Sequence, residues 1–168
     1  MLNCIERVEA IADAMLAKSA VRVGVLFISD ATIQNYRQDL INPAINLSDS
    51  NDLSRRFPEQ LVQNAMSGLE QRMARALAPL FVVQLSYQTD RWNEAYYDGL
   101  RTVAENTMGE ALFCATRGAI ADSVDHCFLR LRQHYSAAIH IPKQGKTVDI
   151  EIHSNGLRLL YRSRFVLR

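Results

Sequence analysis

The polar residues best placed to do chemistry are Ser29 and Asp30, which follow the run from Val21 to Ile28. That run is almost entirely apolar and rich in β-branched residues, so it predicts a buried central strand. Ligands often bind where such strands end, which makes Ser29 and Asp30 a candidate pair for a small-ligand sensor or an enzyme. The simpler interpretation is that Asp30 caps a helix over residues 31–41, because its carboxylate accepts hydrogen bonds from the first free N–H groups.

The end of the chain predicts a β-hairpin. Residues 148–153 alternate apolar and polar side chains, and Ser154–Leu157 (SNGL) has the sequence of a tight two-residue turn. Such a turn sets the register of the two strands. We therefore expect Ile150 opposite Tyr161 and Asp149 opposite Arg162, which places apolar against apolar and acid against base.

The return strand of this hairpin is a second candidate site, because it carries four arginines: Arg158, Arg162, Arg164 and Arg168. Such a row can contact the phosphates of a nucleic acid. The interpretation that we favour is a solvated face whose charges protect a strand edge against aggregation. The reason is that no exposed aromatic residues, on which unpaired bases stack, alternate with these arginines.

Two further residues are candidates for a protein interface. Tyr97 points away from the apolar stripe of its predicted helix, so we expect it to be exposed, and aromatic residues are enriched at interfaces. Arg117 falls on the apolar stripe of the next predicted helix, where a buried guanidinium needs a partner. A carboxylate across a subunit interface would supply one.

Several kinds of site are absent from the sequence. It contains no glycine-rich phosphate loop and no G-x-S-x-G nucleophile motif. The histidines and cysteines lack the spacing of zinc ligands, so we expect neither a metal nor a cofactor. The cysteines are odd in number and contain no C-x-x-C pair, which favours a reducing compartment: Cys4, Cys114 and Cys127.

The elements that must position these residues follow from apolar spacing. A helix is predicted over residues 4–18, and another between Pro58 and Pro79. A second strand is expected at residues 80–87. Residues 44–57 show no pattern and predict a long loop, either functional or disordered.

The second half of the chain predicts two more helices. One begins after Asp90. Thr107–Glu110 (TMGE) has the sequence of a capping box, so the next helix is expected to begin there and to run to about Tyr135. Residues 138–141 predict a short strand before the hairpin. The predicted order is therefore α-β-α-α-β-α-α-β-β-β.

This order predicts the fold class α+β, because helices and strands do not strictly alternate. We expect one domain over residues 1–168, with a mixed or antiparallel sheet, helices packed against it and a C-terminal hairpin. No apolar run is long enough to span a membrane. Acidic residues interrupt the first apolar stretch, so it is not a signal peptide, and a cytoplasmic location is expected.

The formal net charge of +1 is too small to indicate a nucleic acid or an acidic partner. With no assembled catalytic motif, the sequence favours a non-enzymatic protein-interaction module, either a homo-oligomer or a subunit of a larger assembly. The first alternative is a nucleic-acid-binding protein that uses the arginine-bearing hairpin. The second is a small-ligand sensor or an enzyme with a pocket near Ser29 and Asp30.

Overall fold

The computed structural model describes most of the chain: residues 2–18, 22–30, 59–85, 91–133, 147–153, 155–156, 161 and 164–166. The predicted helix at 31–41, the predicted loop at 44–57 and the predicted strand at 138–141 lie outside the described residues. Within the described part, no helix is long and apolar enough to cross a membrane.

The main sheet has three parallel strands that are adjacent in chain order: β1 (Val25–Ser29), β2 (Leu80–Gln84) and β3 (Glu110–Phe113). The register places Val25 beside Leu80 and Phe81 beside Glu110. The expectation of mixed helix and strand is confirmed. The expectation of a mixed or antiparallel sheet is wrong, because a helix lies between each pair of neighbouring strands and returns the chain in the same direction.

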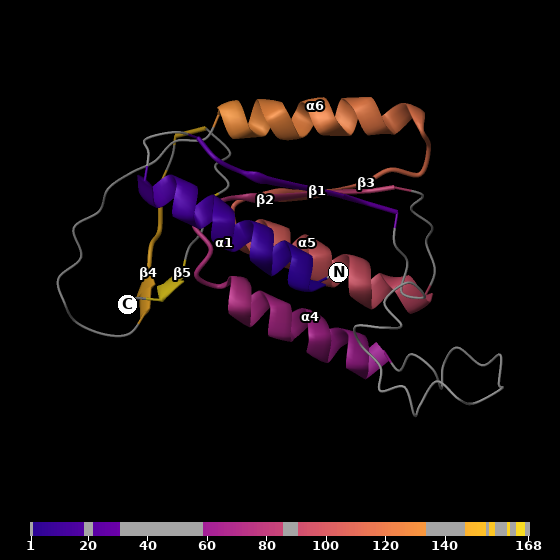
Figure 1. Cartoon of the computed structure of the whole chain (residues 1–168), viewed down its shortest axis with the longest axis horizontal. Coiled ribbons are helices and arrows are strands. Elements are labelled where there is room, and N and C mark those ends of the chain that lie inside the picture. Colours follow the sequence, from indigo (N-terminus) through magenta and orange to yellow (C-terminus); the bar gives the residue numbers. More distant parts are fainter. Residues whose placement is uncertain are drawn as a thin grey trace.

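Helices cover both faces of this sheet (Figure 1). On one face lie α1 (Leu2–Lys18), α4 (Glu59–Met73) and α5 (Arg91–Asn106), and on the other lies α6 (Gly118–Arg132). The side chains of β2 alternate between two apolar cores. Leu80 and Val82 join the core with α1, α4 and α5, whereas Phe81 and Val83 join the core under α6.

Strand β3 replaces the start of a helix that the sequence predicted, so the capping-box interpretation of Thr107–Glu110 is wrong. Helix α5 ends at Asn106 with Met108 in the left-handed region at φ 68°. The N–H of Gly109 donates to the carbonyl of Ala104, and that of Met108 to Glu105, both at 2.9 Å. This pattern is a helix C-terminus, so these residues end one helix instead of beginning the next.

A separate two-stranded sheet pairs β4 (Thr147–Asp149) with β5 (Arg164–Val166). The antiparallel pairing was predicted correctly, and Gly156 has a positive φ of 80°. However, β4 ends at Asp149, so the strand that was predicted over residues 148–153 is wrong beyond that point. The predicted register is wrong by two residues, because Asp149 lies opposite Arg164 and not Arg162. A two-residue shift keeps every side chain on its original face, so the alternation of apolar residues does not distinguish the two registers.

Candidate functional site

A hollow of about 340 Å³ lies at the carboxyl ends of the parallel strands. Each strand contributes to it through the residues that follow: Asp30 after β1, Leu85 after β2, and Ala115, Thr116 and Arg117 after β3. Ile120, in the first turn of α6, completes the lining. The hollow therefore joins three parts of the chain that are far apart in sequence.

The fold itself favours a binding site at this place. The chain leaves β2 towards α5 on one face of the sheet and leaves β3 towards α6 on the other (Figure 1). Two adjacent strands whose connections leave on opposite faces open a crevice between them, and ligands of parallel sheets bind in such crevices. Leu85 and the residues after β3 line the hollow at this point.

One acidic and one basic side chain line the hollow, and each follows a different edge strand of the sheet. Asp30 follows the first strand and Arg117 the third, so two strand spacings, about 10 Å, separate the backbones there. Both residues are exposed. Within the described ranges, neither Asp30 nor Arg117 forms an ion pair.

The sequence predicted Ser29 and Asp30 as a ligand-binding pair, and the structure separates them. Ser29 is buried, and its carbonyl accepts a hydrogen bond of 2.7 Å from the N–H of Leu85. That bond ties the end of β1 to the end of β2. Asp30 alone lines the hollow, while Ser29 helps to hold two of its walls together.

Arg117 precedes α6 and is exposed, so the expectation that it lies on a buried helix stripe is wrong. The predicted stripe began too early because β3 was assigned to the helix. No side chain caps the start of α6, where the first turn is closed by a hydrogen bond from the N–H of Ala119 to the carbonyl of Thr116 (3.2 Å). Arg117 therefore lies beside the positive end of the helix dipole.

Buried contacts hold the connection between β3 and α6 in place. The N–H of Cys114 donates to the carbonyl of Gln84 at 2.8 Å, which extends the pairing of β2 and β3 by one residue. The Cys114 sulfur lies 3.2 Å from Oγ of Ser123 on α6. These contacts support the backbone that carries Thr116 and Arg117, so the wall of the hollow is built on a packed core.

The buried Cys127 is not suited to nucleophilic chemistry. Burial raises the pKa of the Cys127 thiol to about 11, and the nearby Glu110 carboxylate acts in the same direction. A thiol with this pKa is almost entirely protonated at neutral pH, and only the thiolate is a strong nucleophile. Across the residues that the structure describes, no cluster of three metal-binding side chains is found.

Tyr97 was predicted to be exposed, and this prediction is wrong. Only 3% of its surface is accessible, because its ring packs between Tyr96 and Phe113, each with ring centroids 5.5 Å away. Helix α5 is covered by α4 on one side and by the sheet on the other, so a residue away from its main stripe is also buried. Tyr97 therefore belongs to the core.

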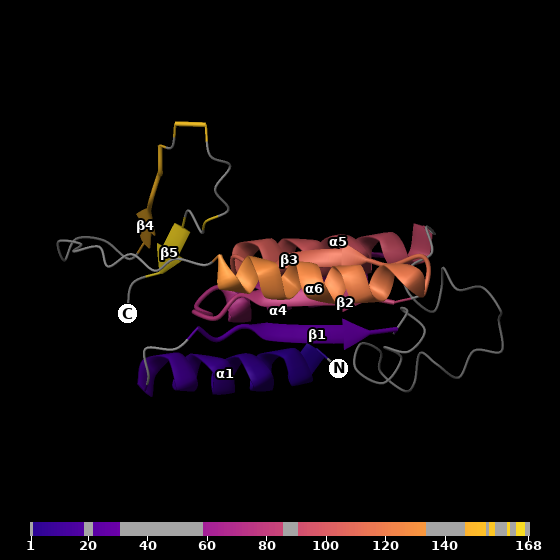
Figure 2. The same cartoon turned by 90° about the horizontal axis from the view of Figure 1, so that it is seen from above.

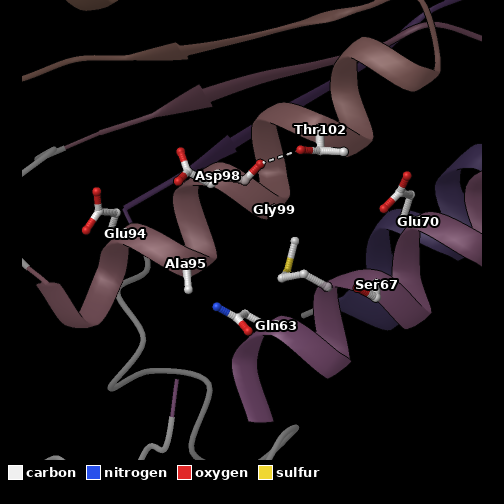
Figure 3. A pocket seen from close by; sticks show the side chains of 9 residues that line it. Gln63, Ser67, Glu70, Glu94, Ala95, Asp98, Gly99 and Thr102 are labelled. Carbon is white, nitrogen blue, oxygen red and sulfur yellow. Dashed lines mark hydrogen bonds between the residues drawn. The ribbon is translucent and has the colours of Figure 1, made fainter. Parts of the chain in front are cut away.

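A larger hollow, of about 670 Å³, lies between α4 and α5 and has three carboxylates in its lining, those of Glu70, Glu94 and Asp98 (Figure 3). Two of them already have partners. Glu70 accepts a hydrogen bond of 2.7 Å from Asn106, and Asp98 pairs with Arg101 at 2.6 Å. Because two of its three carboxylates are already paired on the helices, the hollow at the carboxyl ends of the strands is the better candidate site.

The side chains of the predicted nucleic-acid site lie outside the described residues, which include only the backbone pairing of Arg164. Arg158, Arg162 and Arg168 lie entirely outside the described residues. The sequence missed Leu85, Thr116 and Ile120 as lining residues. Nothing in the sequence around these residues marks them as lining residues. They lie together because the three strands are parallel, which the sequence analysis did not predict.

Comparisons of this chain with family models, with curated proteins and with solved structures find no match. The chain combines helices and strands, and its parallel sheet carries a hollow lined by an acidic and a basic residue.

Proposed function

We propose that this chain is a non-enzymatic binding domain whose ligand occupies the hollow at the carboxyl edge of the sheet. The observation that carries the proposal is the placement of Asp30 and Arg117 in one hollow at the point where the connections leave on opposite faces. The sequence-based hypothesis of a pocket near Asp30 is thus retained, with Arg117 in place of Ser29.

The two charges favour a ligand that is itself charged at both ends. A guanidinium binds carboxylate or phosphate through paired N–H groups, and the start of α6 adds a favourable dipole. The Asp30 carboxylate favours an ammonium group or another hydrogen-bond donor. A short peptide with free termini has this arrangement, since three extended residues span about 10 Å. That length is similar to the separation of the ends of β1 and β3.

Among the residues that the structure describes, no cysteine lines the hollow, and this supports binding over catalysis. Cys127 is a buried thiol with a raised pKa, and Cys114 is buried beside Ser123. Both stabilise the wall of the hollow and neither lines it. We therefore favour recognition of a ligand without chemical change to it.

Triglycine is a suitable probe, because it carries an ammonium and a carboxylate at the required separation. We expect titration with triglycine to shift the amide NMR signals of Leu85, Thr116 and Ile120, with saturation in the millimolar range. The blocked peptide N-acetyl-triglycine amide has the same backbone without the charges and should cause no such shifts.

Substitution of the charged residues provides the control. Arg117→Gln and Asp30→Asn should each raise the Kd by about tenfold, the cost of losing one charge-assisted hydrogen bond. Arg75→Gln and Asp122→Asn change exposed residues outside the hollow and should leave the Kd unchanged. The proposal is wrong if triglycine shifts none of the lining signals, or if both site variants bind like the native chain.

A further inference from the structure

Strand β1 has an open edge in the described part of the chain, because β2 is its only strand neighbour there. The N–H of Val25 donates to the carbonyl of Pro79, and the carbonyl of Ser29 accepts from Leu85, so these residues turn their backbone groups towards β2. Backbone groups alternate in direction along a strand. Leu26 and Ile28 therefore turn their N–H and C=O groups towards the open edge.

The sequence of this edge strand lacks the residues that normally protect a strand edge from pairing. The sequence of β1, VLFIS, contains no charged residue and no proline. The Ile28 side chain is 49% exposed, on the same face as α6. Figure 2 shows the reason, because α6 lies over β2 and β3 and leaves β1 uncovered.

On the opposite face of the sheet, α1 carries an exposed apolar stripe, here called its outer stripe, about a quarter turn from its buried side. Ile5 and Ala12 are buried against the core, whereas the outer stripe carries three large apolar residues that are 48–61% exposed: Val8, Ile11 and Met15. Their spacing of three and four residues makes one continuous stripe. An exposed apolar patch of this kind marks a surface where another protein can bind. Figure 2 shows α1 beside the outer edge of β1.

We propose that the open edge of β1 and the outer stripe of α1 form a two-fold interface with a second copy of this chain. An antiparallel pair centred on Phe27 would place Leu26 opposite Ile28 of the second copy, and these residues would exchange backbone hydrogen bonds. The same two-fold axis brings the two α1 helices together on one face of the sheet. One symmetric contact thus covers both apolar surfaces, which is why a second copy fits better than an unrelated partner.

The size of the surfaces supports this combination. A stable interface buries about 800 Å² on each partner. A single helix of 17 residues, about 25 Å long and 10 Å wide, offers less than this area by itself. The strand edge and the uncovered face around Ile28 add to the helix stripe, and all three are continuous at β1. This interface lies away from the ligand hollow and does not depend on the proposed binding function.

Sedimentation equilibrium of the full chain tests the proposal. We expect a dimer of twice the 19.0 kDa chain mass that dissociates on dilution. Ile28→Lys and Ile11→Lys change exposed side chains, so they should preserve the fold, which circular dichroism checks, and raise the dimer Kd by about tenfold or more. Leu129→Lys is the matched control, because Leu129 is 54% exposed on α6 and should leave the dimer intact.

Hydrogen exchange distinguishes a dimer interface at the β1 edge from an edge that another segment of the same chain covers. The amides of Leu26 and Ile28 should be protected in the dimer and should exchange rapidly when dilution or Ile11→Lys produces the monomer. A chain that stays monomeric at high concentration overturns the proposal. So does a dimer that only Leu129→Lys weakens, or protection of both amides in the monomer.

Discussion

The hydroxyl of Thr107, at the end of α5, accepts a hydrogen bond of 3.0 Å from the backbone N–H of Leu80, the first residue of β2. The same hydroxyl donates to the carbonyl of Ala104 at 2.9 Å. Both Thr107 and Leu80 are fully buried. The side chain that was predicted to begin a helix therefore ends one, and it anchors the central strand of the sheet to α5.

Thr107→Val should destabilise the protein, because it leaves the buried N–H of Leu80 without an acceptor at nearly constant side-chain volume. An unsatisfied buried donor costs about 1–3 kcal/mol. Urea unfolding measures this loss. Thr107→Ser keeps the hydroxyl and should retain most of the stability, and a valine variant as stable as the native chain would contradict the role assigned to the hydroxyl.

Glu9, on the inner side of α1, is only 3% exposed. In the part of the chain that the structure describes, neither oxygen of its carboxyl group has a hydrogen-bond partner. Burial raises the pKa of Glu9 from 4.5 to about 8, and the Asp13 carboxylate nearby adds to this effect. The folded protein therefore holds the Glu9 proton at pH values where the unfolded chain releases it.

The sign of the pH dependence follows from this raised pKa. Below pH 4.5 both states are protonated, and between pH 4.5 and about 8 only the unfolded state loses the proton, so the free energy of unfolding falls as the pH rises. Glu9→Gln stays neutral and should remove this slope. Urea unfolding at roughly pH 5 and pH 9 should show the variant as the more stable protein only at the higher pH.

The exposed Glu105→Gln on α5 provides a control for this prediction and should leave the pH dependence unchanged. The size of the effect measures how far the carboxyl group is desolvated, since each pKa unit corresponds to about 1.4 kcal/mol. A native protein whose stability is as pH-independent as that of Glu9→Gln would show that water or a chain segment solvates Glu9.

Two glycines should respond in opposite directions to the same substitution. A Cβ at Gly109 would overlap the backbone carbonyl of Leu80, so Gly109→Ala must separate β3 from β2 and should cost several kcal/mol, as overpacking does. A Cβ at Gly118 meets nothing within 4 Å, and alanine favours the helix by up to about 1 kcal/mol. Thermal unfolding of both variants checks the two signs, and equal shifts would contradict the packing at Gly109.

The three cysteines should differ in reactivity with a thiol reagent. Cys4 is exposed on α1, whereas Cys114 and Cys127 are buried. We expect one thiol to react rapidly in the native protein and two more to react only after denaturation. Mass spectrometry of the alkylated peptides identifies each site. Rapid labelling of Cys127 in the folded protein would contradict its burial under α6.

Strong local patterns predicted much of the fold. The apolar stripes of α1 and α4 and the β-branched runs of β1 and β2 are visible in the sequence, because each buries a continuous face. Strand β3 was missed for a physical reason. Its four residues are too few for a periodic signal, and Thr107 and Glu110 have the spacing of a capping box although Thr107 bonds to Leu80.

That one error accounts for the wrong sheet type and for most of the incomplete site. Without β3, the pattern of strands and helices does not alternate, so a parallel sheet is not expected. Asp30 was identified because it follows a strand that is visible in the sequence. Its relation to Arg117 depends on the order of all three strands, which local patterns do not contain. The antiparallel pairing near the C-terminus was predicted, although its register and the length of its strands were not.

The most direct test of the proposed site removes one charge from the peptide and one charge from the protein in all combinations. Triglycine amide lacks the carboxylate, and N-acetyl-triglycine lacks the ammonium. Calorimetric titration should show that Arg117→Gln weakens N-acetyl-triglycine but not triglycine amide, and that Asp30→Asn does the reverse. This crossed pattern would show that one ligand spans the hollow from Asp30 to Arg117. Equal effects of both variants on both peptides, or no binding by any of them, would contradict the proposed function.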